Sequence, residues 1–127
     1  MVVLDASAVL AAIFDEAGAD RVARHLAPDM AVLSAVNLAE VASKLVDCGY
    51  SDTDAKITLG TLKLLVGPFM ADTAVATGLL RRATRQHGLS MGDRACLAEA
   101  QLRGLRVLTA DRAWADLKID IDIEVIR

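Results

Sequence analysis

The chain opens on a short apolar run, Val2-Val3-Leu4, that leads directly into the carboxylate of Asp5. A helical pattern of apolar residues follows at once, at Val9, Leu10, Ile13 and Phe14. This arrangement predicts a buried parallel strand whose carboxyl end carries Asp5 into a turn and then a helix. Ligands of open α/β sheets bind outside the carboxyl ends of the strands, so Asp5 stands where chemistry is expected. The alternative is that Asp5 only caps the helix after it.

Strand and helix patterns alternate along the rest of the chain, and no hairpin signal interrupts them. Further strands are expected at 30–33, 69–71, 106–109 and 123–126, and helices at 19–26, 34–46, 52–65, 73–86, 90–102 and 111–115. Strands separated by helices need crossover connections, which predicts a parallel sheet with helices on both faces. The length of 127 residues suits a single domain over residues 1–127.

The composition indicates an aliphatic core, because apolar residues make up 54 % of the chain and aromatic residues only 3 %. No apolar run approaches the ~18–20 residues of a membrane span, and the first residues lack the pattern of a signal peptide. Cys48 and Cys96 each lie in a helical pattern, where we expect reduced, buried thiols in a cytoplasmic protein. A disulfide framework or a zinc site has no support.

The net charge of −3 argues mildly against a nucleic-acid-binding protein. If four carboxylates are committed to a divalent metal, however, 14 basic residues face 17 − 4 = 13 acidic ones, which is close to neutral. Charge alone therefore does not decide the partner.

Four acids stand near the beginnings of helices that follow strands or loops. They are Asp5, Glu40, Asp93 and Asp111. Singly, each has a capping explanation: Asn37-x-x-Glu40 and Ser90-x-x-Asp93 resemble capping boxes, and Asp111 precedes a short helix. Ser, Thr or Asn would cap a helix equally well, so capping alone does not explain why all four positions carry an acid. Four acids together therefore favour a shared site. Converging carboxylates repel one another without a cation, and oxygen-only ligands suit Mg²⁺ or Mn²⁺.

Four stretches that contain these acids resemble the PIN-domain ribonucleases, and most closely the VapC-type toxins of bacterial and archaeal toxin–antitoxin modules. They are Leu4–Ala8, Asn37–Val41, Gly92–Ala98 and Leu108–Trp114. Together they occur in the order and spacing of that family over nearly the whole chain. The resemblance implies a three-layer α/β/α fold of the PIN type with a central five-stranded parallel sheet.

The resemblance also implies an endoribonuclease toxin that depends on Mg²⁺ or Mn²⁺ and hydrolyses phosphodiester bonds in single-stranded regions of cellular RNA. It implies a homodimer and a cognate antitoxin that inhibits the enzyme. In this family the acidic positions correspond to Asp5, Glu40, Asp93 and Asp111, and Ser7 matches the small hydroxyl residue beside the first acid. The RNA target, the cut position, the antitoxin and the number of metal ions do not follow from the sequence.

Asp5 and Asp93 are the expected metal ligands, and Ser7 is expected to hold a carboxylate or a water molecule in place. Further candidates for the metal are Glu40, Asp111 and Asp116. Asp116 has an alternative interpretation as a solvated carboxylate at the end of a helix.

Several basic residues have two open interpretations. Arg94 and Arg112 each follow a proposed metal ligand and either contact RNA phosphate or neutralise their acidic neighbours. The stretch Arg81, Arg82 and Arg85 either contacts the RNA backbone or forms a solvated face that stabilises the carboxyl end of its helix.

Two other classes of protein compete with a nuclease. A phosphatase of the haloacid dehalogenase type would have a second Asp where Ser7 stands, and a receiver domain would have paired acids after the first strand and a Lys after a late strand. A non-catalytic RNA-binding or regulatory protein on the same fold is the other alternative, and four intact acids count against it.

Overall fold

The predicted first strand forms β1, Val2–Leu4, in the middle of a five-stranded, all-parallel sheet. The computed structural model describes residues 1–127. The other strands are β2, Ala31–Ser34; β3, Leu65–Gly67; β4, Val107–Thr109; and β5, Ile123–Val125. Their order across the sheet is β3-β2-β1-β4-β5. The expected α/β class with a five-stranded parallel sheet is thus confirmed.

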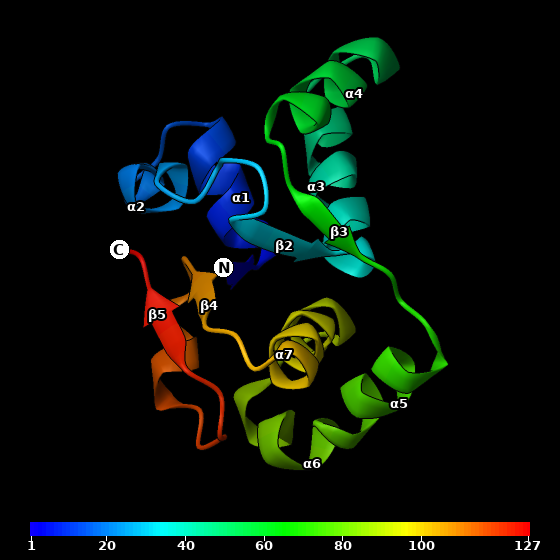
Figure 1. Ribbon diagram of the computed structural model, residues 1–127, viewed down its shortest axis with the longest axis vertical. Coiled ribbons are helices and arrows are strands. Elements are labelled where there is room, and N and C mark those ends of the chain that lie inside the picture. The colour runs from blue at the N-terminus through cyan, green and yellow to red at the C-terminus, as the bar shows by residue number, and fades with distance from the viewer.

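Helices cover both faces of this sheet (Figure 1). One layer holds α1, Ala6–Ile13; α2, Ala19–Ala23; α3, Ala35–Asp47; and α4, Asp52–Thr61. The other holds α5, Ala71–Leu79; α6, Arg81–Thr84; the 3₁₀ turn η1, Arg85–His87; and α7, Met91–Arg103. A second 3₁₀ turn, η2, spans Arg112–Asp116. The chain therefore forms the three layers of an α/β/α fold.

Alternate residues of β1 face opposite layers. Leu4 packs in the cluster that contains α1 and α3, whereas Val3 packs in the cluster that contains α7. Both side chains are completely buried, and full burial of a Val or Leu side chain contributes about 1.5–3 kcal/mol. Trp114 of η2 joins the second cluster and packs this short helix onto the sheet. This two-sided burial explains why β1 reads as a continuous apolar run.

The chain leaves the middle of the sheet in two directions. From β1 it proceeds through β2 to the edge strand β3, and it later returns to place β4 on the other side of β1. Such a change of direction opens a crevice at the carboxyl ends of the two central strands, which is the usual ligand site of these sheets. In this sheet the change of direction falls between β1 and β4.

Two of the predicted elements in the middle of the chain are wrong. The helix expected over 52–65 ends at Thr61, because Lys63 takes a left-handed conformation with φ of 55° and the chain then enters β3. The strand expected at 69–71 does not form, and α5 begins at Ala71 instead. Leu65 and Val66 of this edge strand are both apolar and both exposed, so β3 lacks the alternation of apolar and polar residues that marks a half-buried strand. In the sequence the pattern therefore resembles the end of a helix.

The helix predicted over 73–86 is divided into α5, α6 and η1, with the interruption at Leu80. The environment predicted for Cys48 is also wrong, since this residue is exposed at the carboxyl end of α3. Cys96 is buried as expected, and both cysteines are free. None of the helices combines the length and the apolar character needed to cross a bilayer.

Candidate active site

Asp5 is buried at the end of β1, where its carboxylate accepts hydrogen bonds from three directions. Oδ1 accepts from the backbone N–H of Ala8 at 2.8 Å and from Ser7 Oγ at 2.7 Å. Oδ2 accepts from Thr109 Oγ1 at 2.6 Å. The bond to Ala8 is the predicted helix cap. Asp5 thus caps α1 and also joins the carboxyl ends of β1 and β4.

Burial raises the pKa of Asp5 from 3.8 to about 6. The hydrogen bonds from Thr109, Ala8 and Ser7 lower this pKa, and the negative charge of Asp93 raises it. The carboxyl group is therefore mainly ionised at neutral pH, although it is buried beside a second acid. A cation in this position would offset both costs, because it favours the charged form.

Asp93 lies in the first turn of α7, and the predicted capping box is present. The backbone N–H of Ser90 donates to Asp93 Oδ2 at 3.0 Å, and the N–H of Asp93 donates to Ser90 Oγ at 3.1 Å. Asp93 Oδ1 accepts no hydrogen bond from the protein. One carboxylate oxygen therefore fixes the start of α7 and the other is available to a ligand.

Glu40 is held by a contact between α3 and α7 that the sequence did not predict. Asn37 Nδ2 donates to Glu40 Oε2 at 2.9 Å and to the carbonyl of Gly92 at 3.0 Å. The interpretation of Asn37-x-x-Glu40 as a capping box is wrong, because Ser34 caps α3 through its bond from the N–H of Val36. Asn37 instead orients the Glu40 carboxylate.

Gly92 provides the space that Glu40 occupies. A Cβ atom at this position would overlap Glu40 Oε1. The absence of a side chain on the first turn of α7 therefore lets a carboxylate of α3 approach the backbone that carries Asp93. This close approach is the reason for a glycine here, since Gly92 does not adopt a left-handed conformation.

The Cys96 side chain is completely buried on α7, near several of the acids. Burial raises the pKa of its thiol, and the charges of Asp5, Asp93, Glu40 and Glu99 raise it further. The thiol is therefore neutral. Three of the four acids expected to cluster lie near Cys96, together with Glu99, which is not one of them.

Asp111 and Asp116 are more exposed to solvent than Asp5. Asp111 is exposed, and its Oδ1 accepts from the N–H of Ala113 at 3.0 Å, which caps η2. Its own N–H donates to Thr109 Oγ1 at 3.0 Å, so its backbone still adjoins the Asp5 network. Asp116 is exposed at the end of η2. Neither is among the carboxylates that act on Asp5 or Cys96.

The two arginines considered for RNA binding make backbone contacts. Arg94 Nη1 donates to the carbonyl of Thr77 at 3.2 Å and joins α7 to α5. Arg112 Nε donates to the carbonyl of Arg127 at 3.1 Å and joins η2 to the last residue. Neither arginine forms an ion pair with an acid of the site, so the structure gives no support to charge neutralisation.

Sequence reasoning missed Thr109 as a member of the site. Thr109 is completely buried, donates to Asp5, accepts from Asp111 and lies 3.3 Å from Ser7 Oγ. Its place beside Asp5 follows from the register of β1 and β4, in which Leu4 pairs with Leu108, and no local sequence pattern gives that register.

The residues present fit a small divalent cation. All the donors are oxygen atoms, and Asn37 Oδ1 is a further buried oxygen without a hydrogen-bond partner. No three His, Cys, Asp or Glu side chains converge closely enough to enclose a metal ion. Mg²⁺ does not need such an enclosure, since one or two carboxylates and several water molecules commonly bind it. Asp5 and Asp93 are the pair suited to this role.

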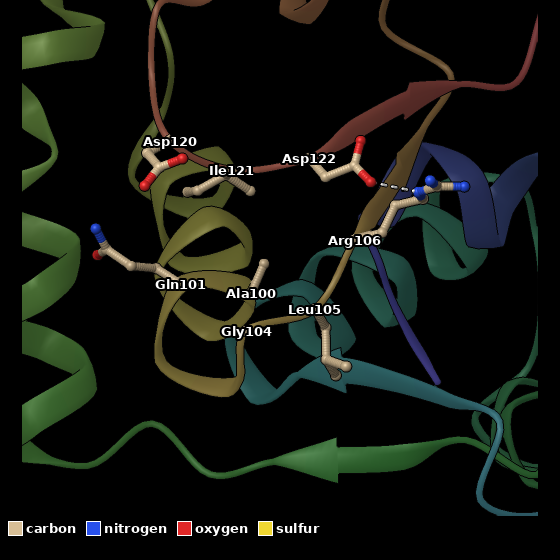
Figure 2. Close-up of a pocket in the computed structure, with 8 residues that line it drawn as sticks. All are labelled: Ala100, Gln101, Gly104, Leu105, Arg106, Asp120, Ile121 and Asp122. Carbon is tan, nitrogen blue, oxygen red and sulfur yellow. Dashed lines mark hydrogen bonds and ion pairs between the residues drawn. The ribbon is translucent and has the colours of Figure 1, made fainter.

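A cavity of about 250 Å³ lies elsewhere, at the amino ends of β4 and β5 (Figure 2). Its lining includes Arg106, whose Nε donates to Asp122 Oδ2 at 2.7 Å, and the end of α7 around Gly104. Asp5 and Thr109 stand at the carboxyl ends of their strands, at the opposite edge of the sheet. The cavity is therefore separate from the acidic site.

The sequence matches the model of the PIN domain family over residues 2–119. The chain belongs to the PIN domain family. The match covers all four acids as well as Ser7 and Thr109. A search of curated protein sequences finds no relative of this PIN domain.

Solved structures share the fold of this PIN domain over nearly its full length. The VapBC complex of Salmonella typhimurium bound to DNA is 19% identical, with a TM-score of 0.76 and full coverage of both chains. VapBC-5 of Mycobacterium tuberculosis is 26% identical with a TM-score of 0.62, covering 99% of this chain and 97% of the other. VapC20 of Mycobacterium tuberculosis, a sarcin-ricin loop cleaving toxin, is 18% identical with a TM-score of 0.70, covering 96% and 99%.

Proposed function

We propose that this PIN domain is a VapC-type toxin, a metal-dependent endoribonuclease that hydrolyses phosphodiester bonds in single-stranded regions of cellular RNA. The main support is Asp5, a buried and largely ionised carboxylate beside Asp93, at the point where the sheet changes direction. The similar structures add support, since one is a toxin that cleaves the sarcin-ricin loop and others are toxin–antitoxin complexes.

The proposed cofactor is Mg²⁺ or Mn²⁺, held by Asp5 and Asp93, with Glu40 beside them. When bound, such an ion lowers the pKa of water and offsets negative charge on a phosphoryl group. Asp111 and Asp116 are assigned to contacts through water, because Asp111 caps η2 and both side chains are exposed.

The protein groups around these acids fix their geometry. Ser7 donates to both oxygens of Asp5 and Thr109 donates to Oδ2, which restricts the orientation of the carboxylate and favours its charged form. Asn37 does the same for Glu40 from within α3. Preorganised carboxylates need little rearrangement during the reaction, which is the main electrostatic contribution a protein can make.

The proposal includes a cognate antitoxin that inhibits the enzyme, and a homodimer of single domains, residues 1–127, acting in the cytoplasm. The support for protein partners is apolar surface on α3, α4 and β3. Val46, Ile57 and Val66 are between 46 and 59% exposed. These residues lie on elements that pack against one another, since α3 contacts both α4 and β3. Exposed apolar side chains on adjoining elements are typical of interaction surfaces.

The test is cleavage of single-stranded RNA by the purified chain in Mn²⁺ or Mg²⁺ and in EDTA. We expect cleavage with either metal and none in EDTA. Asp93→Asn should remove cleavage while retaining the capping box, because the side-chain oxygen of Asn can still accept from the N–H of Ser90. Cleavage that persists in EDTA, or that Asp93→Asn leaves intact, would contradict the proposal. RNA binding without cleavage under all conditions would indicate the non-catalytic alternative.

A further inference from the structure

A stretch of twenty residues, 73–92, contains no acid, although the chain has 17 Asp and Glu residues in total. The same stretch carries Arg81, Arg82 and Arg85, followed by His87. In a protein with a net charge of −3, this is a marked local segregation of positive charge. It ends at Asp93, the first acid that follows.

The side chains of Arg81, Arg82 and Arg85 are exposed on α6 and η1. None of the three guanidinium groups forms an ion pair or a hydrogen bond within the protein. By contrast, five other arginines all pair with acids; they are Arg21, Arg24, Arg103, Arg106 and Arg127. The three unpaired groups thus present charge and donors that the fold itself does not use.

The alternative role, stabilising the carboxyl end of a helix, leaves the donors of these arginines unused. The helix predicted over 73–86 is interrupted at Leu80, so Arg81 and Arg82 directly follow the carboxyl end of α5. Their positive charge favours that helix end, where the dipole is negative. Neither guanidinium donates to a backbone carbonyl there, so the planar donor groups are available to a ligand.

The chain connects this basic surface directly to the acidic site. After η1, Leu89 is buried and Ser90 caps α7, where its N–H donates to Asp93. Five residues span at most about 18 Å, so the Cα of Arg85 lies within about 18 Å of that of Ser90. The segment that carries the three arginines therefore leads directly into the helix start that carries Asp93.

We propose that Arg81, Arg82 and Arg85 form an arginine surface that binds the phosphate backbone of RNA beside the acidic site. This inference rests on the proposed function. A phosphodiester chain is repelled by Asp5, Asp93 and Glu40, so its approach needs cationic groups outside the acidic site. Arginine presents a planar fork of donors that matches phosphate oxygens, and such contacts fix a strand without reading its bases.

The test measures binding without cleavage, by fluorescence anisotropy of a labelled 20-nucleotide oligouridine with the full chain in EDTA. The plot of log affinity against log salt has a negative slope, and each lost phosphate contact to a single strand makes that slope less steep by about 0.7. The variant R81Q/R82Q/R85Q should therefore have a slope about 2 less steep than wild type. It should also bind the RNA at least about tenfold more weakly at low salt. R81K/R82K/R85K keeps the charge and should keep most of the slope. Melting curves establish that both variants remain folded.

A matched control removes charge at the other end of the molecule. Lys56 and Lys63 are exposed, make no ion pair, and lie on α4 and just after it, opposite α6 along the long axis of Figure 1. K56Q/K63Q should leave the slope within about 0.3 of wild type, since its charges contact no phosphate. The proposal would be overturned if K56Q/K63Q reduced the salt slope by as much per removed charge as R81Q/R82Q/R85Q does.

Two further outcomes would overturn the arginine surface. One is an R81Q/R82Q/R85Q variant with the affinity and slope of wild type, and the other is a wild-type chain that binds polyglutamate as tightly as the RNA, which would assign the surface to an acidic polypeptide. The proposed nuclease activity is tested separately. A wild-type chain that binds RNA through these arginines and fails to cleave it would retain the surface and refute the catalysis.

Discussion

Thr109 Oγ1 donates to Asp5 Oδ2 at 2.6 Å, although 104 residues separate the two in the chain. The pairing of β1 with β4 brings them together, since Leu4 pairs with Leu108 and each residue that follows stands at the same edge. A hydrogen bond to a buried carboxylate favours its ionised form and restricts its rotation. Thr109 therefore holds the Asp5 carboxylate in one orientation and favours its charged form, as the proposed cation site requires.

Replacing Thr109 by Val, which has a similar shape, should raise the pKa of Asp5 above about 6, because the bond from Thr109 is the largest influence that lowers it. The acid limb of the pH–rate profile for kcat/KM should therefore move to higher pH. The unfolding free energy should fall by about 1–3 kcal/mol, since a buried acceptor loses its donor. Thr109→Ser keeps the hydroxyl and is the control. An unchanged acid limb in Thr109→Val would contradict this role.

Asp5→Asn should reveal a pH-dependent cost of the buried carboxylate in EDTA. The pKa of Asp5 is about 6 in the folded protein against 3.8 in the unfolded chain, so the folded state binds the proton more tightly. Its contribution to stability is fully present below pH 3.8 and is lost as the pH rises through about 6. The loss is about 3 kcal/mol, at 1.36 kcal/mol per pKa unit.

Asn at position 5 does not titrate, so the variant should gain stability relative to wild type by up to about 3 kcal/mol between pH 4 and pH 7. Urea unfolding at several pH values measures the difference. A difference that does not change with pH would show that Asp5 has an ordinary pKa. Added Mg²⁺ should stabilise wild type more than Asp5→Asn, because stabilisation by a ligand follows its affinity.

Gly92→Ala should displace Glu40, because the added methyl group would overlap the Glu40 carboxylate. We expect a loss of about 1–3 kcal/mol in unfolding free energy, typical of overpacking, together with a loss of RNA cleavage. Gly78→Ala is the matched control, since nothing lies within 4 Å of a Cβ atom there. That change within α5 should stabilise the protein by about 0.5–1 kcal/mol and leave cleavage unchanged. Equal cleavage by both variants would contradict the role given to Gly92.

Asp111 allows its two interpretations to be separated. Asp111→Ala should cost about 1 kcal/mol through loss of the cap on η2, whereas Asp111→Asn should keep the stability of wild type. If Asp111 also acts through water, Asp111→Asn should lower cleavage by about 10- to 100-fold, the range for groups just outside the metal ligands. Cleavage equal to that of wild type would restrict Asp111 to capping.

The acids of the candidate site could be identified from sequence because each lies just after a strand or early in a helix. Asp5 follows an unmistakable buried strand, and Asp93 follows a capping serine at the expected distance. Local pattern determines both positions. It also explains why capping and catalysis could not be separated from sequence, since Asp5 caps α1, Asp93 completes the capping box of α7, and the charge of Asp93 acts on Asp5.

The roles of Asn37 and Thr109 were not predictable, because their hydrogen bonds cross between elements. Asn37 contacts the carbonyl of Gly92, 55 residues away, and this contact depends on how α3 packs against α7. The strand β3 was missed for a related reason. Its place at the edge of the sheet is set by pairing with β2, and nothing in the local apolar run distinguishes it from a helix end.

The edge position of β3 also bears on how this chain behaves in concentrated solution. An open edge with exposed Leu65 and Val66 is a template on which other chains can add strands. The strand has only three residues, and Pro68, which lacks a backbone N–H, follows it directly. A neighbouring strand would find too few partners there to propagate a fibril. Replacing Pro68 by a residue with a backbone N–H should therefore lengthen β3 and lower the solubility of the protein.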